Sequence, residues 1–144
     1  MPENPIAITS DPDPSDARFI EEKLFQYNTK TTGFEFGGNV AAFIRDEQGE
    51  IIAGITGFCW GFTLKIDYLW VREDRRSHDY GTRLLQAAEE EGKRRGCQQV
   101  FLETHSFQAP GFYKKLGYAI FGVLDDYPAG YSQVFLKKEF HQSV

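Results

Sequence analysis

Cysteine is scarce in this sequence: only Cys59 and Cys97 occur among 144 residues, and they fall in different predicted elements. No Cys-x-x-Cys pair and no His/Cys ligand spacing accompanies them. Two such thiols argue against a disulfide framework and against a zinc site. We therefore expect a cytoplasmic protein without a metal, in which both thiols pack as small buried hydrophobic groups.

Long apolar runs and an excess of basic residues are also missing. No stretch approaches the length needed to cross a bilayer, and the acidic, proline-rich start MPENPIAITSDPDP is unlike a signal peptide, so we expect no membrane partner. Sixteen Lys and Arg stand against 21 Asp and Glu, for a net charge of −5. This balance argues against nucleic acid as the main partner and is compatible with a cationic small-molecule substrate.

What the sequence does contain is enough apolar material for one core. The 41% hydrophobic share and thirteen phenylalanines predict a globular chain with a bulky interior rather than a disordered one. At 144 residues the simplest organisation is a single domain, residues 1–144.

The stretch from Leu64 to Leu85 predicts a strand, a short polar loop and a helix. Through Trp70, one set of apolar residues alternates with Lys65, Asp67 and Leu69, which predicts an extended segment whose two faces differ; the set is Leu64, Ile66, Tyr68 and Trp70. Small and apolar residues then recur at spacings of three and four, which predicts an amphipathic helix; they are Gly81, Leu84, Leu85, Ala88 and Gly92. The following Glu89–Glu91 run is expected to be solvated.

A helix that begins directly after such a loop presents unpaired backbone N–H groups and the positive end of its dipole, and phosphate oxygens fit there. Arg75 and Arg76 add positive charge, and Gly81 permits close backbone approach. The loop has a single glycine, so it fits neither the Gly-x4-Gly-Lys-Ser/Thr phosphate loop nor the Gly-x-Gly-x-x-Gly dinucleotide motif.

The remaining elements are placed by turn and helix signals. Before Leu64 we expect a short strand at Ile6–Ile8, a helix starting at Pro14 with Asp13 as N-cap, a loop over Thr29–Asn39, and strands Val40–Arg45 and Ile51–Trp60 joined as a hairpin. After the helix we expect strand Gln99–Thr104, a short helix from near Pro110 to Gly117, and strands Tyr118–Leu124 and Gln133–Lys138. Strand Gln99–Thr104 should pair in parallel with the strand from Leu64 through a right-handed crossover.

Two segments resemble the signatures of the GNAT superfamily of N-acetyltransferases. Arg76-Ser77-His78-Asp79-Tyr80-Gly81 resembles Arg/Gln-x-x-Gly-x-Gly/Ala, with Asp79 in place of the first glycine. The segment from Ala109 to Tyr118 resembles Asn-x-x-Ala-x-x-Phe/Leu-Tyr-x-Lys-x-Gly-Phe/Tyr, with Ser106 in place of the leading Asn. We interpret Asp79 as a helix cap, which would keep its carboxylate from repelling a pyrophosphate.

The resemblance implies the α/β GNAT fold: a splayed, mostly antiparallel sheet of six to seven strands with a central parallel pair and about four helices. It implies acetyl-CoA as donor, an amine acceptor on a small molecule or a protein, no metal, and a possible homodimer. The donor-binding residues it implies are Leu69, Trp70, Val71, Arg76, Ser77, His78, Asp79, Tyr80, Gly81, Thr82, Ser106 and Phe112. Phe34, Glu35 and Phe36 lie in the region that often shapes the acceptor pocket in this superfamily.

Acetyl transfer requires hydrogen-bond donors to the oxyanion, a general acid and a general base. By resemblance, backbone N–H groups near Leu69 and Val71 would stabilise the oxyanion, and Tyr113 would donate a proton to the leaving sulfur. An alkyl amine must lose a proton before it attacks, and either Asp67 or Glu103 could accept it, directly or through water. Lys65 stands where some members carry a glutamate, and no base accompanies Cys59 for an acyl-enzyme route.

Two alternatives stay open at this point. A non-catalytic acyl-CoA-binding sensor or interaction module of the same fold is favoured by the departures at Asp79 and Ser106. A nucleotide-binding domain of another fold would bind ATP or NAD instead.

Overall fold

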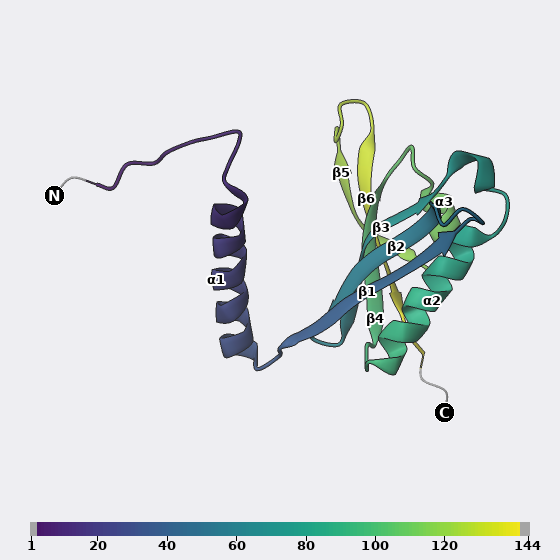
Figure 1. Ribbon diagram of the computed structural model, residues 1–144, viewed down its shortest axis with the longest axis horizontal. Coiled ribbons are helices and arrows are strands. Elements are labelled where there is room, and N and C mark those ends of the chain that lie inside the picture. Colours follow the sequence, from purple (N-terminus) through teal and green to yellow (C-terminus); the bar gives the residue numbers. More distant parts are fainter. Residues whose placement is uncertain (1–2, 142–144) are drawn as a thin grey trace. The chain divides into compact units, whose positions relative to one another are not determined.

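A computed structural model describes residues 3–141 of the chain. They form two compact units, divided between Glu35 and Phe36. The first unit contains helix α1 (Pro14–Thr32), and the second contains the sheet, helices α2 (Tyr80–Arg94) and α3 (Pro110–Lys115), and a one-turn 3-10 helix, Glu73–Arg75 (Figure 1). The described chain thus has three α-helices where about four were expected.

Helix α1 begins as predicted. The Asp13 carboxylate accepts a hydrogen bond from the Ser15 N–H at 2.8 Å, and Pro14 occupies the first turn. The predicted loop Thr29–Asn39 is wrong at both ends, since the helix continues to Thr32 and the next strand starts at Phe36. Gly33 ends the helix in a left-handed conformation, φ 78°, that other residues rarely adopt.

The strand predicted at Ile6–Ile8 does not form. Ile6 and Ile8 are 90% and 93% exposed, and no strand of the described chain pairs with them. Three apolar residues between prolines do not make a strand without a neighbouring edge, because their backbone groups would have no partner.

The sheet of the second unit has six strands in the order β1-β2-β3-β4-β6-β5. Their bounds are β1 (Phe36–Arg45), β2 (Ile51–Trp60), β3 (Thr63–Val71), β4 (Gln99–His105), β5 (Ala119–Asp125) and β6 (Ser132–Glu139). All neighbours are antiparallel except β3 and β4, which confirms the expected mixed sheet with a central parallel pair. The β1–β2 hairpin is also confirmed, with its turn over 46–49 closed by Asp46, whose carboxylate accepts the Gln48 N–H at 2.9 Å.

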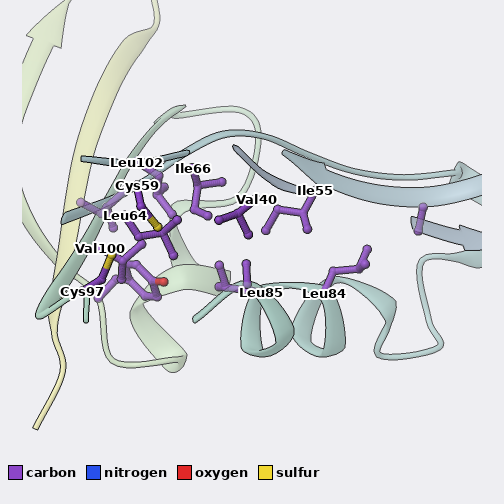
Figure 2. Packing of buried hydrophobic residues seen from close by; sticks show 14 of the residues in the cluster. Val40, Ile55, Cys59, Leu64, Ile66, Leu84, Leu85, Cys97, Val100 and Leu102 are labelled. Atoms are coloured by element: carbon purple, nitrogen blue, oxygen red, sulfur yellow. The ribbon is translucent and has the colours of Figure 1, made fainter. Parts of the chain in front are cut away.

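Helix α2 covers one face of the sheet and forms the core with it (Figure 2). Leu84 and Leu85 point from the helix toward Val40, Ile55 and Ile66 on the strands, and all five are at most 4% exposed. The predicted amphipathic stripe is therefore correct. Burial of these side chains drives the helix onto the sheet.

A bulge in β3 overturns the predicted strand face. Thr56 pairs with Tyr68 while Gly57 pairs with Ile66, so Asp67 is an extra residue in β3. Alternation resets there, and Leu69 and Val71 pack on the core while Tyr68 and Trp70, 78% and 49% exposed, point to the opposite face. Leu64, Ile66, Tyr68 and Trp70 do not share one face.

The prediction that Glu89–Glu91 is exposed to solvent is wrong for Glu89. Glu89 is 4% exposed and accepts two hydrogen bonds, from the Tyr118 hydroxyl at 2.7 Å and from Lys138 Nζ at 2.9 Å. Burial and the neighbouring carboxylate raise the pKa of Tyr118, so its phenol stays a donor at neutral pH. The buried Glu89 carboxylate thus links α2 to Tyr118, the residue before β5, and to Lys138 in β6.

Cys59 and Cys97 are both buried and free, in agreement with their prediction as small core residues. They lie in the same part of the core (Figure 2). Burial, followed by a hydrogen bond with Cys59, raises the pKa of Cys97 to about 12, so this thiol is not a nucleophile at neutral pH.

Leu85→Ala should destabilise the second unit. Leu85 is 0% exposed, so its truncation leaves a cavity between α2 and the sheet and should lower the free energy of unfolding by about 2–5 kcal/mol. Urea unfolding followed by circular dichroism measures this. Gln86→Ala, on the exposed face of the same helix, is the control; equal stability of the two variants would contradict the assigned packing.

Candidate functional site

The site begins where two parallel strands separate. β3 and β4 pair only over Thr63–Lys65 with Gln99–Phe101, and beyond these three pairs a cavity of about 750 Å³ opens. Its lining combines the end of β3, the loop before α2, the start of α2, the end of β4 and the start of α3. The residues are Asp67, Tyr68, Leu69, Trp70, Val71, Arg76, Ser77, Asp79, Gly81, Thr82, Glu103, Thr104, Phe107, Gln108, Ala109, Phe112 and Tyr113.

Three of the predicted donor-binding residues do not line this cavity: His78, Tyr80 and Ser106. His78 donates from Nδ1 to the Arg75 carbonyl at 3.2 Å, and its ring stacks on Tyr80 with 5.7 Å between centroids. Ser106 is tied to β6, because its hydroxyl accepts the Ser132 N–H at 3.0 Å. Of the residues predicted to shape the acceptor pocket, Phe36 lies in β1 and does not line the cavity. Phe34 and Glu35 belong to the first unit.

The start of α2 faces the cavity through Gly81 and Thr82. The first N–H with a partner inside the helix is that of Arg83, which donates to the Asp79 carbonyl at 3.0 Å. The N–H groups before that of Arg83 lie ahead of the intrahelical hydrogen-bond pattern, at the positive end of the helix dipole. This end of the cavity therefore suits an anion.

Asp79 occupies the N-cap position of α2, but its side chain makes no capping hydrogen bond, so its interpretation as a cap is wrong. Its backbone is left-handed, φ 61° and ψ 15°. Aspartate tolerates that conformation better than most residues, and glycine tolerates it best. The departure from the motif glycine thus keeps the backbone geometry and adds a carboxylate to the lining.

The two predicted arginines separate. Arg76 lines the cavity, and its Nε donates to the Val71 carbonyl at 3.1 Å, which holds the guanidinium at the end of β3. Arg75 lines a second, smaller hollow of about 390 Å³ with Arg45 and Tyr80. Of these two arginines, Arg76 is therefore the one that adds positive charge to the main cavity wall.

Gly81 lets α2 and α3 approach each other closely. A Cβ at this position would lie 3.3 Å from Phe112 Cζ and 3.8 Å from Val71 Cγ2. The space beside Gly81 is thus filled by Phe112, whose ring meets that of Tyr113 edge to face at 5.1 Å. A side chain at this position would press on the Phe112 ring, which packs beside Tyr113.

Tyr113 has a half-buried side chain on α3. Burial raises the pKa of its phenol, which keeps the hydroxyl protonated at neutral pH. The group can therefore donate a proton or a hydrogen bond within the cavity, and cannot act as a base there.

The two predicted carboxylates reach the cavity from opposite sides of the opening, Asp67 from the bulge of β3 and Glu103 from β4. Asp67 lies 3.9 Å from Lys65 Nζ. Among residues 3–141, no cation lies within ion-pair distance of Glu103. The geometry brings both groups to one site without choosing between them.

Sequence reasoning missed Tyr68, Thr104, Phe107, Gln108 and Ala109 as lining residues. Tyr68 is turned to its face by the bulge, which the alternation hides. Phe107 and Gln108 lie between Ser106 and Ala109 of the second motif, and Ala109 is itself a motif position, which is the signal that marks this turn. Gln108 Oε1 shapes this turn by accepting the His105 N–H at 2.9 Å and the Thr104 hydroxyl at 3.3 Å.

Within the part of the chain that the structure describes, no three His, Cys, Asp or Glu side chains gather as a metal site would require. None of the described helices is both long enough and apolar enough to cross a membrane.

Comparison with known proteins places this geometry in a family. Residues 7–118 match the family model described as Acetyltransferase (GNAT) family. Blasticidin-S acetyltransferase of Streptomyces morookaense is 37% identical over 100 residues, which cover 69% of this chain and 74% of that protein. The crystal structure of an acetyltransferase from Bacillus cereus is 36% identical, with a TM-score of 0.77 over 93% of this chain and 98% of that one.

A more distant likeness concerns the fold alone. The structure of a Bacillus anthracis protein, solved in complex with acetyl coenzyme A, is 22% identical, with a TM-score of 0.62. The match covers 72% of this chain and 63% of that one.

Proposed function

This chain belongs to the GNAT acetyltransferase family, and from that premise we propose that it transfers an acetyl group from acetyl-CoA to an amine by direct attack in a ternary complex. One observation carries the proposal. A single cavity joins the N-terminus of α2, the Tyr113 phenol and the carboxylates of Asp67 and Glu103 between two separated strands.

Donor binding is assigned to the α2 end of the cavity. The diphosphate of acetyl-CoA would accept hydrogen bonds from the first N–H groups of α2, with Arg76 held beside them by Val71. Asp79 lines the same end and opposes this attraction in part. From there the acyl arm would run between β3 and β4 toward Tyr113.

Acetyl transfer then uses three kinds of group: hydrogen-bond donors to the oxyanion, a general acid and a general base. The amine nitrogen attacks the thioester carbonyl carbon, and backbone N–H groups near Leu69 and Val71 stabilise the oxyanion. The C–S bond breaks as Tyr113 gives its proton to the sulfur. Asp67 or Glu103 takes the proton that the amine loses, since an alkyl amine of pKa about 10 is almost wholly protonated at neutral pH.

The acceptor is proposed to be a cationic amine. Two carboxylates, those of Asp67 and Glu103, line the cavity together with the exposed rings of Tyr68, Trp70 and Phe107. Such walls attract a cation by charge and by its contact with ring faces. The likeness to blasticidin-S acetyltransferase makes blasticidin S the first compound to test.

Calorimetric titration with acetyl-CoA, followed by a free-thiol release assay on a panel of amines that includes blasticidin S, tests this function. We expect binding of acetyl-CoA and amine-dependent release of CoA. A non-catalytic module is the second candidate, favoured by Asp79 in the cavity lining, and binding without release on any amine would establish it instead. Binding of ATP or NAD in preference to acetyl-CoA would contradict both.

Tyr113→Phe should lower kcat at least tenfold, because the ring is kept and only the proton donor is lost. The Kd for acetyl-CoA should change little. Thiol-release kinetics and calorimetry measure the two quantities. Tyr127→Phe, at a half-exposed tyrosine outside the cavity, is the control; an unchanged kcat in Tyr113→Phe would remove the phenol from the mechanism.

Gly81→Val should weaken acetyl-CoA binding by about tenfold or more, because the new side chain pushes against Phe112 at the start of α2. Gly111→Val is the matched control, since a Cβ at Gly111 meets no atom within 4 Å. Titration of both variants compares their Kd values. Equal affinities would place donor binding away from this end of α2.

A further inference from the structure

Helix α2 contacts the segment that carries Tyr113 at two separate places. The first is Gly81 against Phe112, at the cavity end of the helix. The second lies about two turns further along α2, where Glu89 binds Tyr118. The Tyr113 ring contacts the rings of both Phe112 and Tyr118, with centroid distances of 5.1 Å and 5.8 Å.

The second contact is a paired, buried carboxylate. Glu89 accepts the Tyr118 hydroxyl through one oxygen at 2.7 Å and Lys138 Nζ through the other at 2.9 Å. Glu89 and Tyr118 are each 4% exposed. Charge-assisted hydrogen bonds in a dry environment are short and directional, so they fix the Tyr118 ring relative to α2 more narrowly than apolar packing would.

Tyr118 in turn holds both the backbone and the ring of Tyr113. Its N–H donates to the Tyr113 carbonyl at 3.1 Å, and the two rings meet at 71°. Helix α3 spans only Pro110–Lys115, too short to keep its own position by helical hydrogen bonds. The place of Tyr113 therefore depends on what its neighbours contact.

An apolar residue at position 89 would serve stability as well as a buried ion pair does. What the ion pair adds is a defined distance from the middle of α2 to Tyr118, on the helix whose first turn faces the anion end of the cavity. We propose that Glu89, acting through Tyr118, is a positioning residue that sets the Tyr113 hydroxyl relative to the N-terminus of α2. This rests on the proposed function.

A double-mutant cycle tests the inference. Tyr118→Phe keeps the ring and removes the hydroxyl that Glu89 holds, so kcat should fall about fivefold or more with the Kd for acetyl-CoA nearly unchanged. In the Tyr113→Phe background the same change should alter kcat by less than about 1.5-fold, because the group being positioned is gone. Equal losses in both backgrounds would overturn the inference.

Glu89→Gln should reproduce the effect of Tyr118→Phe, while Glu90→Gln is the control because its carboxylate is exposed on the same helix. Thermal unfolding of each variant separates a loss of folded protein from a loss of kcat. A variant with a lower Tm but a full kcat at a temperature where it is folded would assign Glu89 a purely structural role and overturn the inference.

A second readout does not need turnover. In protein labelled with ¹³Cζ-tyrosine, the Tyr113 resonance, identified by its loss in Tyr113→Phe, should titrate above the ordinary pKa because the phenol is buried. Tyr118→Phe should lower that pKa toward its ordinary value, because a Tyr113 ring that is no longer held in place is more exposed to water. An unmoved titration would overturn the positioning role even if no amine were acetylated, whereas a moved titration without acetylation would count against the proposed function alone.

Discussion

Hydrogen bonding between β3 and β4 stops after three residue pairs, at Lys65 and Phe101, although both strands continue. The sheet therefore opens within the second unit and not at its edge. The opening admits side chains from both strands and backbone groups that a continuous ladder would have used. The bulge at Asp67 accompanies it, since one extra residue changes the twist of β3 and turns Tyr68 and Trp70 to the face away from α2.

Helix α2 fixes the positions of the segments that line the opening relative to one another. Its buried stripe fixes it on the sheet, its first turn faces the cavity, and its middle holds Glu89. The loop before it, the α3 segment and β6 all contact this one helix directly or through one residue. Distances within the site are consequently set by a rigid element, as catalysis by proximity and orientation requires.

Much of this arrangement could be predicted because local signals were strong. The hairpin, the helix stripe from Leu84 to Ala88, the parallel pair and the strands that follow α3 all come from periodicity, turn residues and chirality. The bulge could not be predicted, because alternation in the sequence runs unbroken through Asp67. Glu89 was equally hidden, since its partners Tyr118 and Lys138 are distant in sequence and a run of three glutamates resembles a solvated face.

The left-handed backbone at Asp79 limits how the loop before α2 can vary. Most side chains are strained there, whereas asparagine and glycine are not, and an aspartate codon becomes an asparagine or a glycine codon by one nucleotide change. The charge beside the first turn of α2 can thus be erased by one point mutation without reshaping the loop, while larger chemical changes at the same position carry a conformational cost. Natural variation at this residue should accordingly alternate among three amino acids.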